Sequence, residues 1–450
     1  MADQFLPDSS TTATLHIPVA WFRSLVHRVK QAPHLIATGE LGVSLRPDTA
    51  CDLLVRSLEL VPARDAVRSH QPGRVRYVIA FVPHTVERNG GAWQALAWMF
   101  RLEEKPPYPS LAVLHFGTAA EIGTFTGIYT SGDRIIPIRQ LHLVGAGMAR
   151  FDAIDFRQSD PGPPESDRWS RLIGALGGPR VWQRLTSLSI AVVGIGRTGS
   201  LVAAALARSG CRQIMLIDPD HVEPHNLDAM DLVTPSDLGS SKAAAVAQHM
   251  RALNPALDVM VIPTSVFSQA AHTALKAAQV MICTVDDPGA RLLTGALATT
   301  YLKPWLDIGT GIFRWHVIRS RLTALNTPHL LMGADVRLIL PGDGCVLCFG
   351  GVAHLPEVLQ TWGQPVRRPW QTERAGSLRS LNMLAVATGL RWLEELVMGR
   401  LTRSVWQRAE VTTQGLVEWH SMPPRRDPAC LLCAATGSAD VQAAGNAKSP

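Results

Sequence analysis

The fold is decided by the stretch "SIAVVGIGRTGSLVAAALARSGCRQIMLIDPDHVEPHNL", which runs from residue 189 to residue 227. One apolar run predicts a buried strand at 189–194, and a second predicts another strand at 213–218. Between them lie the glycine pattern G-x-G-x-x-G and an apolar helical segment. This order of strand, glycine turn, helix and strand is typical of a nucleotide-binding α/β fold.

Three glycines and one carboxylate in this stretch favour nucleotide binding. Gly194 permits the tight turn, Gly196 lets a phosphate approach the backbone, and Gly199 lets the helix pack on the strand. The free N–H groups at the start of the helix then face the anion. Asp218, at the end of the second strand, can accept a hydrogen bond from a ribose hydroxyl. The pattern alone does not separate NAD from ATP, and a glycine-rich turn without a ligand is the alternative.

The chain around this stretch predicts a Rossmann-like α/β domain. Strands and helices alternate from residue 189 to about residue 311, which indicates a mainly parallel sheet covered by helices. Further along, residues 378–397 predict an amphipathic helix, and "SVWQRAEV" and "GLVEWHS" predict two strands. The other strands of the parallel sheet are predicted at 257–263, 280–284 and 305–308.

A separate N-terminal domain is predicted at 1–156, because "RQSDPGPPESD" at 157–167 is rich in proline and acid and is typical of a linker. We expect this domain to have an α+β fold, and the small and polar residues 434–450 to form a disordered tail. Within the N-terminal domain, strands are predicted at 76–83, 110–117 and 141–147, and a helix is predicted at 91–104.

The composition excludes several classes of protein. Of 450 residues, 46% are hydrophobic and 18% are charged, which suits well-buried globular domains. There is no long uncharged apolar run and no secretion signal, so we expect a cytoplasmic protein that has no contact with a membrane. The net charge of +6 is mild for this length and the arginines are scattered, so a nucleic-acid partner is not expected.

Two CxxC pairs predict a structural zinc site. Cys345 and Cys348 form one pair, and Cys430 and Cys433 form the other, which together supply the four thiolates of a closed tetrahedral site. Reduced thiols without a metal are the alternative. The other three cysteines stand among apolar residues and are expected to be buried thiols: Cys51, Cys211 and Cys283.

Several ordered motifs carry a resemblance to the ThiF/MoeB/HesA superfamily, which includes the ubiquitin-activating enzymes. "LIDPDHVEPHNL" resembles the family segment DxDxVExxNL, and "VMICTVDDPGAR" resembles its DxTDNxxxR loop. "DRWSRLIGALGG" resembles the family's entry helix, with Arg171 at its second arginine, and "LGSSKA" places Lys242 at the phosphate-binding lysine. With "CVLC" and "CLLC" at the zinc site, the resemblance spans about residues 167–433 and implies an adenylation domain at 168–433.

The resemblance implies adenylation of the C-terminal carboxylate of a small β-grasp protein, with ATP and Mg²⁺ as cofactors and pyrophosphate as a product. Lys242 and Arg171 would neutralise the triphosphate, the latter across a homodimer interface, and Asp286 would hold the magnesium. Ordinary surface roles for the two cations and a helix-capping role for Asp286 are the alternatives. The implied nucleotide site comprises Gly194, Gly196, Gly199, Asp218, Asp220, Asn226, Lys242, Asp286 and Asp287.

Two departures from the family pattern concern the phosphates. The family continues NLxRQ where this chain has "NLDAM", so Ala229 stands in place of an arginine that would contact the triphosphate. Asp287 stands in place of the usual asparagine. Losing one preorganised donor costs about 10²–10³ in rate. A weakened enzyme, a rearranged site and a pseudoenzyme are the three readings of these changes.

A third departure concerns transfer of the activated acyl group. Many members of the family carry a nucleophilic cysteine before the C-terminal helix, where this chain has "QTERAGSLRSLN" with Thr372 at that place and Ser377 nearby. A hydroxyl is a much weaker nucleophile than a thiolate at neutral pH, so we expect no thioester there. Direct transfer to a partner, an oxyester on either hydroxyl, and use of another cysteine remain open, although Cys211 and Cys283 are disfavoured by burial.

The N-terminal domain loosely resembles a JAB/MPN-type isopeptidase domain. Such a domain needs a His-x-His pair for its metal, and His115 has no second histidine two residues away, so metal-dependent hydrolysis is not expected. His115 and His84 then read as ordinary strand or turn residues, and the domain as a recognition or dimerisation module.

These features favour an activating enzyme of a bacterial ubiquitin-like conjugation system, which would pass its product to a conjugating-enzyme-like partner. The alternatives are sulfur-carrier activation of the thiamin or molybdopterin type, adenylation of a non-protein acid, and a catalytically impaired scaffold subunit. An NAD-dependent dehydrogenase would leave Asn226, Lys242 and the zinc motif unexplained.

Overall fold

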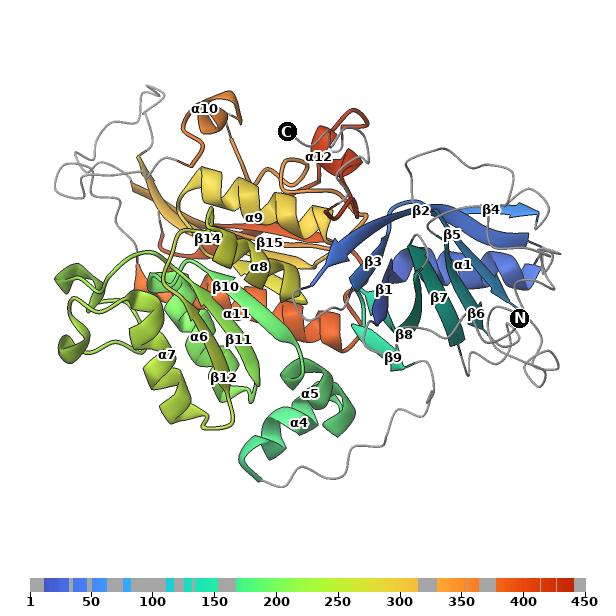
Figure 1. The fold of residues 1–450 in the computed structure, drawn as a ribbon. Helices are drawn as coiled ribbons and strands as arrows, with labels where there is room; N and C mark the ends of the chain where they lie inside the picture. Colours follow the sequence, from blue (N-terminus) through green and yellow to red (C-terminus); the bar gives the residue numbers. More distant parts are fainter. Residues whose placement is uncertain are drawn as a thin grey trace, which may run out of the picture. The chain divides into compact units, whose positions relative to one another are not determined.

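The chain divides into two compact units in the computed structural model (Figure 1). The first unit comprises Met1–Asp160, Thr300–Leu302 and Ala435–Pro450, and the second comprises Pro161–Thr299 and Lys303–Ala434. The structure describes residues 12–31, 35–46, 51–62, 76–81, 111–116, 125–131, 134–152, 167–314, 330–353, 355–363, 378–412, 414–425 and 427–440.

The second unit is built on an eight-stranded sheet in the order β12-β11-β10-β13-β14-β15-β16-β17. Its first five strands in this order are parallel, and they match the five strands predicted from the alternating pattern. The bounds of the parallel strands are β10 Ser189–Val193, β11 Gln213–Ile217, β12 Asp258–Ile262, β13 Val280–Cys283 and β14 Trp305–Arg314. Strand β10 is buried along its whole length, as expected of a parallel strand that is covered on both faces.

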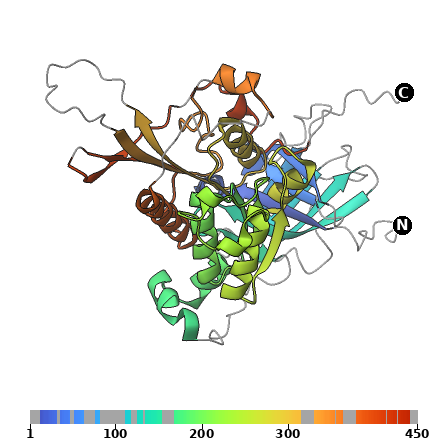
Figure 2. The same cartoon turned by 90° about the vertical axis from the view of Figure 1, so that its left-hand side faces the viewer.

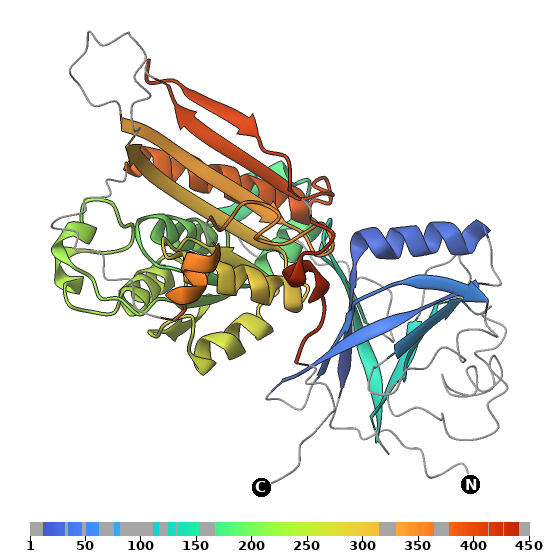
Figure 3. The same cartoon turned by 90° about the horizontal axis from the view of Figure 1, so that it is seen from above.

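Three antiparallel strands extend this sheet beyond β14 (Figure 3). Strands β16 (Val405–Val411) and β17 (Val417–Ser421) were predicted, whereas β15 (Leu330–Ile339) was not. Gly333, Asp335 and Arg337 interrupt the apolar run of β15, so the local sequence gives no strand signal. The strand forms because it pairs with β14 along its whole length. The fold class is therefore α/β with a mainly parallel sheet, as predicted.

Helices cover both faces of this sheet (Figures 1 and 2). Helix α6 packs against α7 and α11. Helices α8 and α9 lie in front of the sheet in Figure 1, while α11 passes behind it. Their bounds are α6 Arg197–Arg208, α7 Lys242–Leu253, α8 Gln269–Ala277, α9 Pro288–Thr300 and α11 Arg379–Val397; the shorter ones are α4 Ser170–Leu176, α5 Pro179–Thr186, α10 Leu355–Gln360 and α12 Leu431–Ala434.

The order of the strands reverses at β10, which lies between β11 and β13. From β10 the chain moves through β11 to β12 on one side, and then returns to pair β13 with the other side of β10. The loops that leave the carboxyl ends of β10 and β13 therefore run to opposite sides of the sheet. In open α/β sheets, ligands bind at the carboxyl ends of the strands where the strand order reverses in this way. The glycine loop follows β10, and Asp286 follows β13.

The first unit is a mixed sheet whose pairings return to their start, because β1 pairs with both β3 and β8. A buried cluster, which includes Leu15, Ile17 and Leu53, packs with helix α1 (Val19–Gln31). The strands are β1 Ala13–Pro18, β2 Leu35–Leu45, β3 Cys51–Val55, β4 Glu59–Pro62, β5 Arg76–Phe81, β6 Leu111–Phe116, β7 Phe125–Ser131, β8 Arg134–Val144 and β9 Ala149–Asp152. The three predicted strands correspond to β5, β6 and β8; the predicted helix 91–104 lies outside the described residues.

The end of the chain belongs to the first unit. Asp440 accepts from the backbone N–H of Leu45 and from the hydroxyl of Ser44, and its own N–H donates to Val43 O. A Cβ at Gly42 would lie 1.9 Å from the carbonyl oxygen of Gly437, so the two backbones are in close contact. The first part of the segment that we expected to be disordered, up to residue 440, thus has a defined place on β2. Residues 441–450 and the greater part of the predicted linker lie outside the described residues.

Two further expectations concern burial. Cys51, Cys211 and Cys283 are buried, as predicted, and burial raises the pKa of each of these thiols. Among the described helices, none combines the length and the apolar character that a membrane-spanning segment requires.

Candidate functional site

The three glycines of the loop have different surroundings. Gly194 has φ +87°, and a Cβ there would lie 2.9 Å from Val285 Cγ1. A Cβ at Gly199 would lie 1.9 Å from the carbonyl oxygen of Gly194. A Cβ at Gly196, by contrast, would have no described heavy atom within 4 Å outside its own neighbours. The fold therefore needs Gly194 and Gly199, while Gly196 faces open space just before helix α6.

This difference predicts opposite results for two alanine variants. Gly199→Ala forces the strand and helix apart and should lower the free energy of unfolding by about 1–3 kcal/mol, the usual cost of overpacking. Gly196→Ala should leave stability nearly unchanged and weaken ATP binding, because its methyl group enters the open space. Urea unfolding and calorimetry with ATP measure the two effects. Equal ATP affinity for Gly196→Ala and wild type would contradict a phosphate at this turn.

Asp218 is 5% exposed at the end of β11. Its carboxylate accepts from the backbone N–H of Ile195 at 2.5 Å and of Asp220 at 2.8 Å, so it holds the glycine loop in place. Burial raises the pKa of Asp218, and the nearby Lys242 charge and the two N–H donors oppose that rise. Asp218 thus lies beside the loop, where the sequence predicted a ribose contact.

Lys242 is the first residue of helix α7 and lies against Asp220. Its Nζ donates to Asp220 Oδ2 at 2.9 Å, and its backbone N–H donates to Asp220 O. The Lys242 side chain is only 12% exposed, which is unlike a free surface lysine. Asp218, Asp220 and Lys242 therefore form one charged group beside the glycine loop.

Asn226 has a structural role that the motif did not specify. It is 5% exposed, and its side-chain oxygen accepts from the backbone N–H of Glu223 at 2.9 Å. This bond shapes the turn that leads to Ala229, which is also buried. Whether Asn226 contacts a nucleotide stays a prediction.

The two carboxylates after β13 have different surroundings. Asp287 accepts from the N–H groups of Gly289 and Ala290 at 3.1 and 3.0 Å, so it caps helix α9. The capping role that we considered for Asp286 is thus filled by its neighbour. Asp286 itself is exposed at the carboxyl end of β13, on the side where a cation can reach it. Arg171 is also exposed, on α4.

A buried charged network supports the loop that carries Asp286. Arg291 donates to Val285 O at 2.5 Å and to Asp307 Oδ1 at 3.0 Å. Asp307 is fully buried and also accepts from Arg337 Nη1 at 2.9 Å. Arg337 in turn donates to the carbonyl oxygens of Phe349 and Gly350, which follow the first CxxC pair. Within the second unit, this network links the loop that carries Asp286 to the backbone that follows the first CxxC pair.

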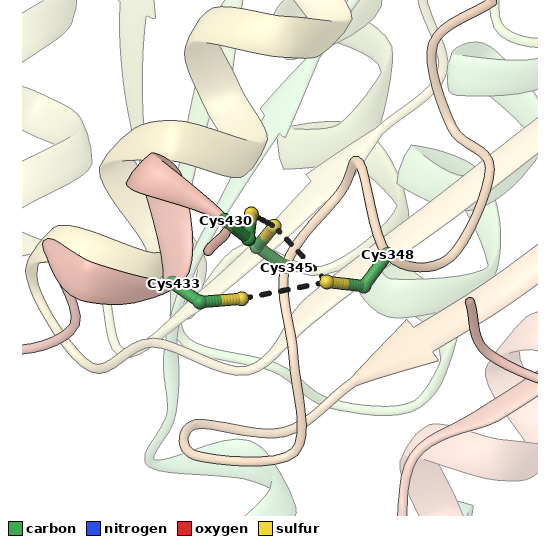
Figure 4. Close-up of side chains that lie close together, drawn as sticks. All are labelled: Cys345, Cys348, Cys430 and Cys433. Atoms are coloured by element: carbon green, nitrogen blue, oxygen red, sulfur yellow. Dashed lines mark hydrogen bonds between the residues drawn. The ribbon is translucent and has the colours of Figure 1, made fainter. Parts of the chain in front are cut away.

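The four paired cysteines meet as predicted (Figure 4). Their sulfur atoms all lie within 4.8 Å of one another, with Cys345 to Cys430 at 3.5 Å and Cys348 to Cys433 at 3.4 Å. These distances are too long for disulfides, whose sulfur atoms lie about 2.05 Å apart. A tetrahedral zinc with bonds of about 2.3 Å would separate its sulfurs by about 3.8 Å. The donor set and its geometry therefore fit a structural zinc ion.

Some predicted residues cannot be placed, and others were missed. Thr372, Ser377 and His84 lie outside the described residues, and His115 is described only as a backbone position in β6. Two arginines that the sequence did not single out contact the segment around Ala229. Arg379 donates to Ala229 O and to Asp231, and Arg197 donates to His225 O. An arginine inside the glycine pattern was the available signal for Arg197.

Comparison with known proteins finds a family match for part of the chain. Residues 169–330 match the ThiF family. A sulfur carrier protein adenylyltransferase from Thermus thermophilus is 31% identical over 141 residues, which cover 31% of this chain and 52% of that protein. A tRNA threonylcarbamoyladenosine dehydratase from Escherichia coli is 37% identical over 100 residues, which cover 22% of this chain and 37% of that protein. The chain thus spans about half the length, or less, of these curated relatives.

Similar solved structures include E. coli MccB with ATP, at a TM-score of 0.44 and 20% identity over 61% of this chain and 76% of that chain. A likeness this weak has no bearing on activity. The matching segment contains the glycine loop, the Asp218–Lys242 group and the Asp286 loop. Residues 169–330 of this chain therefore form a ThiF family domain, of the superfamily that their motifs predicted.

Proposed function

We propose that the protein uses ATP to adenylate the C-terminal carboxylate of a ubiquitin-like β-grasp protein. One observation carries the proposal. The open turn at Gly196, the partly buried Lys242 side chain and the exposed Asp286 carboxylate all lie at the carboxyl edge of the parallel strands, where the strand order reverses. A nucleotide needs those three features: a place for phosphate, a cation and a carboxylate.

Each residue then has a distinct task. The N–H groups that follow Gly196 bind phosphate, and Lys242 neutralises part of its charge in a poorly solvated place. Asp218 keeps the loop in the form that admits phosphate and lies next to the ribose. Asp286 would hold magnesium, which supplies charge neutralisation on the phosphate oxygens when bound. An oxygen of the carrier's carboxylate would bond to the α-phosphorus while the bond from that phosphorus to the pyrophosphate leaving group breaks, and positioning of the two reactants would supply much of the rate.

Exchange of labelled pyrophosphate into ATP tests this proposal. The assay uses the full chain, Mg²⁺ and, in turn, a ubiquitin-like and a sulfur-carrier β-grasp protein that each end in glycine. Asp286→Asn should lower the exchange rate by about 10²–10³, which is the scale of losing one preorganised charge contact. Asp258→Asn is the matched control. Asp258 begins β12, so it lies at the amino edge of the parallel strands, away from the proposed nucleotide site, and this variant should retain the wild-type rate.

No carrier-dependent exchange by the wild-type chain, or an equal rate for Asp286→Asn, would contradict the proposal. The curated relatives include both a sulfur-carrier adenylyltransferase and ubiquitin-like modifier-activating enzymes, so the two carrier classes should be assayed side by side. We favour a bacterial ubiquitin-like conjugation system with a conjugating-enzyme-like partner, in a reducing cytoplasm that keeps the cysteines free to bind zinc.

Two features of the proposed enzyme concern its assembly and acyl transfer. Arg171 is exposed on α4, so it would meet the phosphates of a second copy in a homodimer. Thr372 and Ser377 offer hydroxyls in place of a cysteine, and direct hand-over of the adenylate is the transfer that we favour.

A scaffold subunit that binds no nucleotide is the second candidate, because Ala229 carries no charge where the family has an arginine. It shares the fold and differs in one measurable property. Calorimetric titration of the full chain with ATP separates the two candidates, since a scaffold would release no heat of binding.

A further inference from the structure

Arg197 occupies an electrostatically unusual position. It is the first residue of helix α6, directly after Gly196, and the first turn of this helix contains no acidic residue. The N-terminus of a helix carries partial positive charge, so a cation there is unfavourable unless an anion lies close to it. Positions where a sequence breaks such a local rule are often functional.

Two contacts of Arg197 are with the connection between β11 and α7. Arg197 Nη2 donates to His225 O at 2.9 Å and lies 3.0 Å from Asp228 Oδ1. The Asp228 side chain is 64% exposed and that of Arg197 is 26% exposed. An ion pair this exposed to solvent is weak, so a more highly charged anion can displace Asp228 from the arginine.

Lys242 shows the same arrangement at the neighbouring helix. It is the first residue of α7, and it pairs with Asp220, which is also 64% exposed and comes from the same connection. Helices α6 and α7 pack against each other, and the first residue of each is a cation that pairs with an acid of the connection between β11 and α7. The turn at Gly196, where an added Cβ would meet no described heavy atom within 4 Å, directly precedes Arg197.

Resting on the proposed function, we infer that Arg197 binds the phosphate chain of a nucleoside triphosphate, and that Asp228 holds this arginine until the nucleotide arrives. Arg197 supplies a positive charge close to the segment in which Ala229 offers none. The triphosphate replaces Asp228 on Arg197 and Asp220 on Lys242, and its negative charge also offsets the unfavourable position of the arginine at the helix N-terminus.

The test measures the affinities of the full-length chain for ATP and for adenosine. Arg197→Ala should weaken ATP at least tenfold and leave adenosine unchanged, and Arg197→Lys should restore part of the ATP affinity. Arg208→Ala removes an arginine from the other end of the same helix and should bind both ligands as wild type does. A merely structural role for Arg197 would weaken both ligands together.

Asp228→Asn separates the two roles further. If Arg197 binds phosphate, this variant keeps or tightens ATP binding, because the competing carboxylate is gone. If Arg197 serves only to hold residues 225–228, Asp228→Asn weakens ATP as Arg197→Ala does, and the inference is overturned. Unchanged ATP affinity in Arg197→Ala overturns it as well. Failure of the wild-type chain to bind ATP would instead refute the proposed function, which keeps the two failures distinct.

Discussion

Replacing Cys430 with serine is expected to abolish stoichiometric zinc and to lower the free energy of unfolding of the second unit by several kcal/mol. The physical reason is that four cysteine sulfurs from two distant segments converge on one point, and a zinc ion bound there would link the two segments. Structural zinc in small domains contributes about 10–16 kcal/mol of apparent binding free energy at neutral pH. Removing one of four ligands forfeits much of that contribution.

The measurements are the zinc content of the purified full chain and its thermal unfolding with and without a chelator. Cys211→Ala is the control, because this thiol is buried away from the cluster and should leave the zinc content at one ion per chain. A wild-type chain that contains no zinc, and whose unfolding temperature is insensitive to chelation, would mean that the four thiols are unliganded.

Asp307→Asn is expected to cost about 3–5 kcal/mol of unfolding free energy, the range found when one partner of a buried ion pair is removed. Asp307 is fully buried between Arg291 and Arg337, at 3.0 and 2.9 Å, so the change leaves two guanidinium groups without their shared anion. We also expect a lower affinity for Mg²⁺, because Arg291 then holds the Val285 carbonyl beside Asp286 less firmly. Urea unfolding at neutral pH and a magnesium titration of nucleotide binding measure the two effects.

Asp335→Asn is the matched comparison. Burial acts to raise the pKa of Asp335, but Arg337 and the bonds from Arg408 and Trp406 outweigh it and hold the pKa below its ordinary value. A carboxyl group with a lowered pKa stabilises the fold above its unfolded-state pKa, and that contribution is lost as the pH falls through the folded-state value. Asp335→Asn should lower the free energy of unfolding less than Asp307→Asn does, because the Asp335 side chain is 21% exposed and that of Asp307 is fully buried. The loss caused by Asp335→Asn should disappear in acid, where the wild-type carboxyl group is protonated as well. Equal costs at neutral pH would contradict the special role of the fully buried carboxylate.

The parallel strands, the glycine loop and the cysteine cluster could be predicted because each is encoded locally. An all-apolar strand such as β10, a CxxC spacing and a glycine that must avoid a Cβ clash leave their mark within a few residues. Strand β15 could not be predicted in this way, since its charged residues are satisfied by partners distant in the sequence. Arg337, for example, reaches Asp307 and the carbonyl oxygen of Phe349.

The residue types of the candidate site were predicted from the sequence, but the contacts that these side chains make with one another were not. Sequence motifs located Asp286 and Asp287, but only the structure shows that the second of them caps α9 and leaves the first exposed. Arg197 is visible in the glycine pattern of the sequence. Its ion pair with Asp228, however, depends on the three-dimensional fold and could not be predicted from the pattern. Long-range pairings of this kind leave no periodic signal in the sequence.

The docking of Asp440 on β2 means that the first unit cannot be isolated by a single cut in the gene. A fragment that stops before the second unit would leave the backbone from Gly42 to Leu45 without its covering segment, and an uncovered strand edge invites aggregation. A circularly permuted fragment, in which residues 435–440 precede β1 on a short linker, would keep that segment with the strand it covers.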